Sequence, residues 1–225
     1  KLTNKKGFTL MEMLIVVAAS LLCITFHETC HGLVAYWMGD PTAKKQGRLS
    51  LNPLRHIDIM GLVMMAVCHF GWAKPVPVDM RNFRRPKAGM ALTALAGPVS
   101  NVLLAYVAIL FASASAAVYM CSDSKVVYYL WLFFFYLEIM SAGLAVFNLF
   151  PIPPLDGSKV LFAVLPDAWY GKLMRYERFG MVLLAVLLLT GVLDTPLSFL
   201  RDGLTGALEA IGTWPADLIL NAFGA

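Results

Sequence analysis

Long apolar stretches separated by more polar connections constrain this chain more than any other feature. The longest cover residues 8–38, 90–120 and 126–150, and a shorter one covers residues 180–193. About 20 apolar residues form a helix that crosses the ~30 Å hydrocarbon core of a bilayer. Only 14% of the residues are charged, against about 25% in soluble domains. The sequence therefore predicts an all-α polytopic membrane protein with about four transmembrane helices.

Three segments depart from this simple pattern. Gly97-Pro98 lies early in residues 90–120, which predicts a short first piece followed by a spanning helix. Residues 60–70 are apolar but too short to span, so we expect a re-entrant or shallow element there. Residues 71–86 are rich in proline and basic side chains, which favours an extended loop or an edge hairpin.

The chain is expected to form a single membrane-embedded domain over residues 1–225. Residues 1–20 give it an atypical start. Residues 196–225 mix charged with apolar side chains, which predicts a peripheral C-terminal helix. No long polar segment suggests a soluble appendage.

The charges indicate how the helices cross the membrane. Basic residues concentrate in residues 44–87 and 159–178, whereas residues 122–125 carry one base and one acid. By the positive-inside rule, the two basic regions are expected on the cytoplasmic side of a cell membrane. The net charge of +4 is modest and gives no reason to expect a nucleic-acid partner. The expected surroundings are a lipid bilayer.

One motif near the end of the first apolar stretch carries metal chemistry. His27-Glu28-x-x-His31 places two imidazoles one helical turn apart, where both can bind one Zn²⁺. Glu28 is then placed to move a proton of a zinc-bound water, as a catalytic residue. Ionisable groups inside an apolar helix are costly unless they serve a function. The alternative is a structural polar cluster between helices.

A catalytic zinc usually has three protein ligands and one position for water. Asp156 is the best candidate for the third, because it follows a proline-rich break after the apolar stretch ending at residue 150. Broken backbone at membrane depth is tolerated where it lines a cavity. With the predicted topology, His27, His31 and Asp156 meet toward the cytoplasmic leaflet. The alternative for Asp156 is a loop-capping carboxylate beside Gly157.

Three ordered motifs resemble the site-2 protease family of intramembrane zinc metalloproteases. They are His27-Glu28-x-x-His31, Ala96-Gly97-Pro98-x-x-Asn101 and Asn148-x-x-Pro151-x-Pro153-Pro154-Leu155-Asp156-Gly157. Residues 32–43 and 71–78 look like the compact subgroup without a PDZ domain, which is usually bacterial or archaeal. The resemblance implies a Zn²⁺ cofactor, a transmembrane protein substrate, and substrate-binding roles for Asn101 and Asn148. Either asparagine can alternatively hold helices together.

The predicted function is hydrolysis of peptide bonds in or near transmembrane segments by a zinc endopeptidase. Zinc would activate water and polarise the scissile carbonyl, while Glu28 transfers the proton. The alternative is a catalytically silent membrane scaffold that binds transmembrane helices. The intact Glu28 argues against it.

The first 20 residues also resemble a type IV prepilin signal. A basic leader, Gly7 before Phe8, and Glu12 in the apolar segment carry this likeness. A chance basic start, an engineered fusion and a natural acquisition all account for it, and a pilin-like subunit is the function it alone suggests. Glu12 needs a partner or a position near the interface.

The remaining metal-binding side chains lack ligand spacing. Cysteines occur at positions 23, 30, 68 and 121 without a Cys-x-x-Cys pair, so we expect neither a disulfide framework nor a cysteine zinc site. His56 and His69 are expected to be surface or loop histidines.

Overall fold

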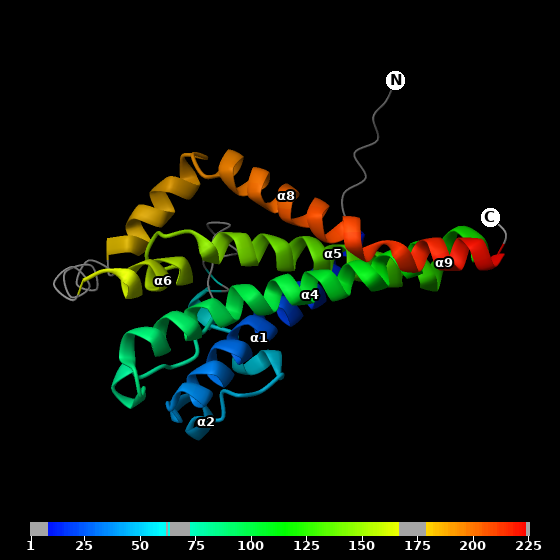
Figure 1. Cartoon of the computed structure of the whole chain (residues 1–225). Helices are drawn as coiled ribbons and strands as arrows, with labels where there is room; N and C mark the ends of the chain where they lie inside the picture. Colours follow the sequence, from blue (N-terminus) through cyan, green and yellow to red (C-terminus); the bar gives the residue numbers. More distant parts are fainter. Residues whose placement is uncertain (1–8, 62, 64–72, 167–178, 224–225) are drawn as a thin grey trace.

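The computed structural model describes residues 9–61, 63, 73–166 and 179–223, and these contain helices but no strand. Three long helices form the centre of the molecule: α1 (Leu10–Met38), α4 (Pro86–Ser122) and α5 (Lys125–Leu149). They lie side by side in Figure 1. Each is long and apolar enough to cross a membrane. The predicted all-α membrane fold is confirmed.

A tight turn joins α4 to α5 and makes them antiparallel. Asp123 ends α4 in a left-handed conformation with φ of 46°, and its N–H donates to Tyr119 O at 2.9 Å. The core where α1, α4 and α5 meet is built on the small residues Ala19, Cys23 and Ala108, with Leu104 and Leu137. Small side chains let helix backbones approach closely, which favours this packing inside a membrane.

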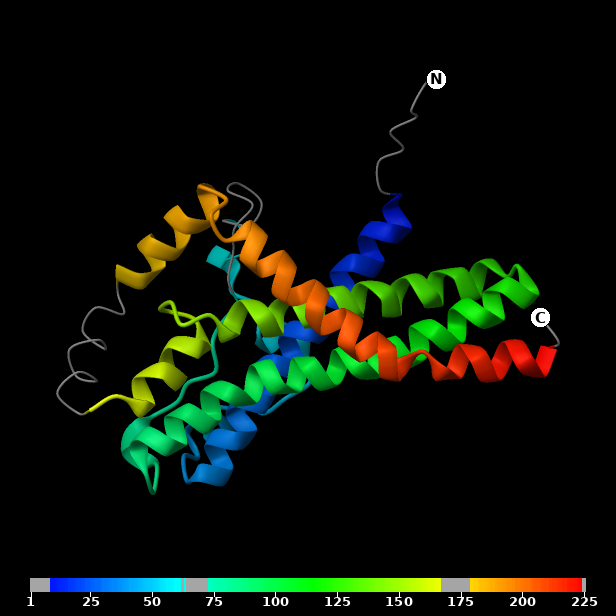
Figure 2. The same ribbon diagram turned by 45° about the horizontal axis from the view of Figure 1, so that its top comes forward.

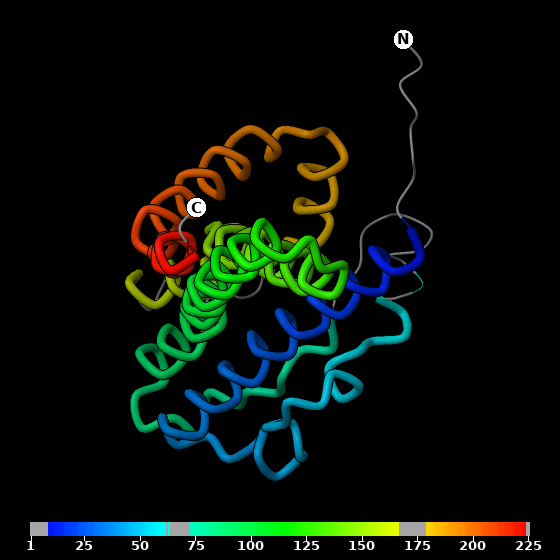
Figure 3. The backbone as a smooth tube through the Cα atoms, turned by 90° about the vertical axis from the view of Figure 1, so that its right-hand side faces the viewer, coloured from blue at the N-terminus to red at the C-terminus, as the bar shows by residue number. Residues whose placement is uncertain are grey.

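A fourth span is present if two bent helices are taken together. The helix Phe179–Leu189 and α8 (Asp194–Gly212) meet at an angle of 87°. α8 then packs against α4 and α5, and α9 (Trp214–Phe223) continues along α4. Figures 2 and 3 show α8 and α9 passing over the antiparallel helices α4 and α5. The described residues thus hold three spans, or up to four, in agreement with the predicted number.

The predicted interruption at Gly97-Pro98 is wrong. α4 runs through it as one helix of 37 residues. Pro98 removes one backbone hydrogen bond. The helix continues because α4 has buried, packed residues both before and after Pro98. Ser100 adds a local bond, since its Oγ donates to Gly97 O at 2.7 Å.

The start of α1 gives Glu12 the partner that the sequence left open. Thr9 precedes the helix, its Oγ1 accepts from Glu12 N, and Thr9 N donates to Glu12 Oε2 at 2.7 Å. This reciprocal pair is a capping box, in which two side chains accept from two backbone N–H groups at a helix start. Residues 1–8, the rest of the prepilin-like pattern, lie outside the described residues.

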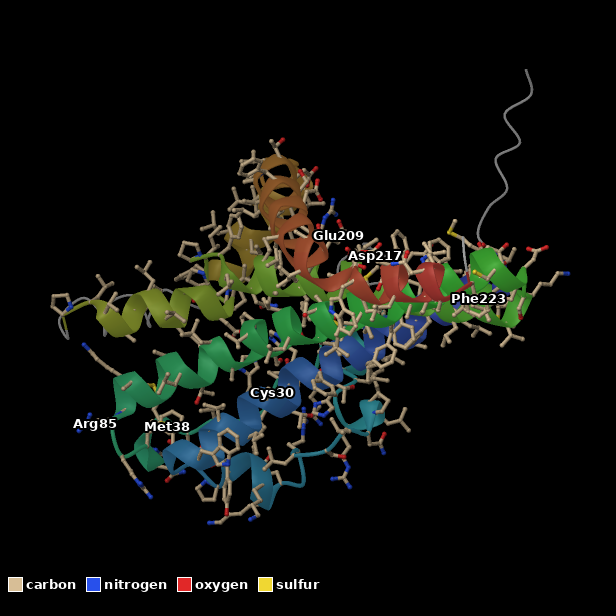
Figure 4. The ribbon with its side chains drawn as sticks, turned by 45° about the vertical axis from the view of Figure 1, so that its right-hand side comes forward. Cys30, Met38, Arg85, Glu209, Asp217 and Phe223 are labelled. Carbon is tan, nitrogen blue, oxygen red and sulfur yellow. The ribbon has the colours of Figure 1, made fainter. Side chains whose placement is uncertain are left out.

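The connection between α1 and α4 folds around Asp40. It contains α2 (Thr42–Lys45), η1 (Pro53–Arg55) and η2 (Met80–Asn82). Asp40 is fully buried, and its carboxylate accepts bonds from Thr42 N, Asp79 N and the Asn82 amide at 2.7–3.0 Å. These bonds bring the end of α1 and the start of α4 to one end of the molecule, where Figure 4 labels Met38 and Arg85.

Part of that connection carries predictions on residues that are not described. The expected re-entrant element over residues 60–70 falls mostly on positions 62 and 64–72, which lie outside the described residues, as does His69. Residues 73–79 have no regular secondary structure, as the proline content of the segment predicts.

Candidate metal centre

Two histidines of α1 face the interior of the helix bundle one turn apart. His27 and His31 retain 5% and 8% of their surface, and their Nε2 atoms lie 3.0 Å from each other. The rings meet edge to face, with centroids 4.5 Å apart. The expected geometry of the His-x-x-x-His spacing is therefore present, with both Nε2 atoms pointing to one place.

The third donor is a carboxylate from α6 (Asp156–Val164), a short helix after the proline-rich break. Asp156 Oδ2 lies 3.2 Å from His27 Nε2 and 3.0 Å from His31 Nε2. Gly157 permits this placement, because a Cβ there would lie 2.2 Å from Leu149 O at the end of α5. The first turn of α6 can therefore press directly against the α5 backbone.

Helix α4 forms the wall behind the two imidazoles. A Cβ on Gly97 would lie 2.4 Å from His31 Nε2 and 2.5 Å from His27 Cε1. On the same helix, Thr93 O lies 2.6 Å from His31 Nδ1. A ring that donates Nδ1–H to this carbonyl presents the Nε2 lone pair to a metal. The glycine thus provides room, and the carbonyl fixes the tautomer.

Asn101 lies beside His27 on α4 and does not line either of the two cavities described below. It is fully buried, and its amide nitrogen is 3.2 Å from His27 Nδ1. Its Oδ1 is buried and has no hydrogen-bond partner among the described atoms. The substrate-binding role expected from the sequence stays a prediction.

These residues fit a zinc ion. The donor atoms of His27, His31 and Asp156 all lie within 4.8 Å of one another, and all three residues are buried. Donors that bind one tetrahedral zinc at about 2.0–2.2 Å lie roughly 3.3–3.6 Å apart, close to the separations seen here. Two neutral imidazoles and one carboxylate are also a common donor set of catalytic zinc sites.

The pKa of Asp156 supports the same use. Burial alone raises the pKa of this carboxyl group, but contacts with His27, His31 and Lys159 outweigh burial and lower it. Lys159 Nζ lies 3.6 Å from Asp156 Oδ1, one turn along α6. The carboxylate is therefore ionised at neutral pH, the form that binds metal. Sequence reasoning missed Lys159, although its i+3 spacing on a helix is readable.

A cavity of about 340 Å³ opens beside His27, and Leu155, the residue before Asp156, also lines it. His27, Glu28 and Asn148 line it, together with apolar side chains of α1 and α5 and the loop residues Pro53 and His56. One Glu28 oxygen, Oε2, accepts a hydrogen bond from Val76 N at 2.9 Å. Asn148 donates to Leu144 O in its own helix at 3.1 Å. Glu28 and Asn148 thus share one space, from which Asn101 is absent.

His56 and the described cysteines, from which the sequence predicts no metal site, lie outside the metal centre. His56 belongs to a loop, as expected, but it is buried, and its Nε2 lies 2.8 Å from Ser50 O. It is therefore a buried loop histidine and not a surface one. Its contact with Ser50 O holds the loop beside the cavity. Cys23, Cys30 and Cys121 are free thiols, and Cys68 lies outside the described residues.

A helical membrane bundle in which two histidines and an aspartate converge beside a glutamate-lined cavity defines the class of membrane-embedded zinc metalloproteases. The chain belongs to peptidase family M50, the site-2 proteases. The model of this family matches residues 112–192, the part of the chain that contains Asp156. The chain is thus a zinc metalloendopeptidase with Zn²⁺ as its cofactor, as predicted.

Several relatives support this family over most of the chain. They carry the name "Putative zinc metalloprotease" and include YwhC of Bacillus subtilis, Rip2 of Mycobacterium tuberculosis and MJ0611 of Methanocaldococcus jannaschii. YwhC is 37% identical over 183 residues, which is 81% of this chain and 84% of the relative. Rip2 is 30% identical over 80% of this chain and 68% of its own length. MJ0611 is 29% identical, covering 69% of this chain and 73% of the relative. No solved structure matches the chain significantly.

Proposed function

We propose that this metalloprotease hydrolyses peptide bonds in or near the transmembrane segments of other membrane proteins. The observation that carries the proposal is the position of its site. The candidate zinc ligands His27 and His31 lie within the 29-residue apolar helix α1, at the contact with the equally apolar α4. A substrate must therefore reach a site enclosed by membrane helices.

We assign His27, His31 and Asp156 to the metal. When bound, zinc polarises the scissile carbonyl and lowers the pKa of a water molecule. The buried α4 wall excludes water from one side of the two histidines, and the cavity gives access to the site at His27. Glu28 lines that cavity, so its carboxylate accepts the water proton and passes it to the leaving amine.

The bond from Val76 N to Glu28 Oε2 orients this carboxylate. One oxygen is held by the loop, which leaves the other available for proton transfer. Because the backbone N–H also donates to a glutamine oxygen, although less strongly than to a carboxylate, Glu28→Gln removes the base and keeps the loop contact.

The two asparagines receive different roles. Asn148 lines the cavity beside Glu28, so we assign it to the substrate, whose unwound backbone needs hydrogen-bond partners. Asn101 is buried against His27, so we assign it to the orientation of that ligand.

The proposed orientation places the site toward the cytoplasmic leaflet of a cell membrane. Supporting it, the basic connection between α1 and α4 lies at the end of the bundle reached by the second halves of α1 and α5. Basic loops of this kind are retained on the cytoplasmic side.

The test uses the full chain reconstituted in liposomes with transmembrane-helix substrates and with soluble peptides of matched sequence. We expect the parent to cleave the membrane substrates. Glu28→Gln is expected to keep about one zinc per chain and lose cleavage by at least ~100-fold. Asp156→Ala is expected to lose zinc as well.

Glu12→Gln is the matched control, because it makes the same change in the same helix and glutamine also serves in a capping box. It should cleave like the parent. Undiminished cleavage by Glu28→Gln would overturn the assigned base. Cleavage of soluble peptides alone would overturn the membrane substrate, while leaving the metalloprotease assignment intact.

A further inference from the structure

A second cavity, of about 550 Å³, lies on the other side of the loop that borders the first one. Ile57 and the segment around it line both cavities. No acidic residue is among the described residues that line the second cavity. Four of its lining side chains are basic: Lys45, Arg48, Arg55 and Lys74. Cations from three separate parts of the loop therefore surround one space.

Arg48 gives this cavity its most informative feature. Its side chain is buried, with 8% of the residue exposed. The guanidinium donates to Lys74 O at 2.7 Å and Pro75 O at 3.3 Å, whereas Nε is buried without a partner. Both acceptors are neutral carbonyls. A buried cation without an anionic partner is costly.

The charges around Arg48 do not compensate it. Among the described residues, no carboxylate forms an ion pair with Arg48, Lys45, Arg55 or Lys74. Arg55 instead donates to Gly47 O. The like charges of this cluster repel one another, so an anion that enters the cavity gains from all of them.

One apolar side chain of the cavity lining is highly exposed, and two more exposed apolar side chains lie close to it in the chain. Leu54, which lines the cavity, is 74% exposed, and Leu51 and Ile59 nearby are 61% and 80% exposed. Exposed aliphatic side chains next to a cationic hollow suit a ligand that has an anionic head and an apolar tail. The neighbouring spans place this loop where lipid is available.

We propose that this basic cavity binds the phosphate of an anionic phospholipid headgroup. Lys45 and Lys74 are exposed at the mouth of the cavity and contact the phosphate oxygens. The buried guanidinium of Arg48 attracts the same phosphate from inside the cavity. The acyl chains lie along Leu51 and Leu54. A free phosphate offers the same oxygens without the apolar contact, so the two sources are separable.

The structure also connects this cavity to Glu28. Arg48 holds the carbonyls of Lys74 and Pro75, and the next residue, Val76, donates its N–H to Glu28. A lipid headgroup bound in this cavity therefore stabilises the segment of residues 74–76, which orients Glu28. The binding itself does not depend on the proposed peptidase substrate.

The test measures binding by calorimetry with the full chain in a neutral detergent. The probes are short-chain phosphatidylglycerol, short-chain phosphatidylcholine and inorganic phosphate. We expect tight binding of phosphatidylglycerol only. The double variant Lys45→Gln/Lys74→Gln should weaken this binding about 30-fold, since each basic residue near an anionic headgroup raises the affinity by a factor of about five.

The charge-matched control is Arg84→Gln/Arg85→Gln, which removes two exposed cations of the same connection outside the cavity. It should bind within about twofold of the parent, and thermal unfolding of both variants checks that they fold. Equal weakening by the control would show unspecific attraction and overturn the site. Binding of inorganic phosphate as tight as that of the lipid would overturn the lipid as its ligand.

Discussion

The side-chain amide nitrogen of Asn101 lies 3.2 Å from Nδ1 of His27, although 74 residues separate the two in the chain. A neutral imidazole that offers Nε2 to zinc carries its proton on Nδ1 and therefore needs an acceptor there. Rotation of the amide by 180° exchanges its oxygen and nitrogen with little other change. The buried Oδ1 then accepts the ring proton, and Asn101 orients His27.

Replacement of Asn101 by leucine is therefore expected to weaken zinc binding by about 10–100-fold, the usual effect of removing such a partner. Asn101→Asp should restore most of the affinity, because a carboxylate oxygen also accepts from Nδ1–H. Competition with a chromogenic chelator measures both affinities. Parent-like zinc affinity in Asn101→Leu would exclude the orienting role.

Asn148→Leu should behave differently, because Asn148 lines the cavity and contacts none of the three donor residues in the described hydrogen bonds. We expect unchanged zinc affinity and a kcat/KM lower by about 10²–10³-fold if its amide binds the developing oxyanion. Steady-state cleavage and zinc titration on the same sample separate the two effects. Loss of zinc in this variant would contradict the assignment.

Gly97→Ala should distort the metal centre, because the new Cβ would lie 2.4 Å from His31 Nε2. The imidazoles have to move, at a cost of about 1–3 kcal/mol for such overpacking, and zinc affinity falls with them. Gly143→Ala on α5 is the control, since a Cβ there meets nothing within 4 Å. It should be neutral or raise stability by up to about 1 kcal/mol. Equal behaviour of the two variants would contradict the close approach.

Asp40→Asn should lower the free energy of unfolding by about 2 kcal/mol at pH 7, because charged acceptors make the stronger hydrogen bonds. Burial raises the pKa of Asp40, but bonds from Thr42, Asp79 N and Asn82 outweigh it and lower the pKa below 3.8. The stability from this carboxylate is thus complete above the unfolded pKa and is lost as the pH falls through the folded one.

Unfolding in mixed micelles at pH 7, 5 and 3.5 checks this. The difference between parent and Asp40→Asn should be constant from pH 7 to 5 and shrink below pH 4. The control is Asp79→Asn, because Asp79 is more exposed and Arg81 lowers its pKa to about 2. It should destabilise less. A difference that grows on acidification would refute the role of Asp40.

Local spacing explains which parts of the site were predictable. His27 and His31 converge because helix geometry puts positions i and i+4 on one face. Asp156 was predictable because the chain direction brings the end of α5 to the same end of the bundle. The interruption of α4 was predicted wrongly, since a rule for isolated helices ignored the packing around Pro98.

The sequence by itself thus determined the helical membrane class, the zinc chemistry and the peptidase family, because apolar length and short motifs are local properties of the chain. Only the tertiary structure decided what lies behind and beside the ligands. Contacts between distant segments place Asn101 against His27 and Val76 N against Glu28. They also bury Arg48 without an anionic partner. Such contacts depend on how helices and loops pack, which no local spacing encodes.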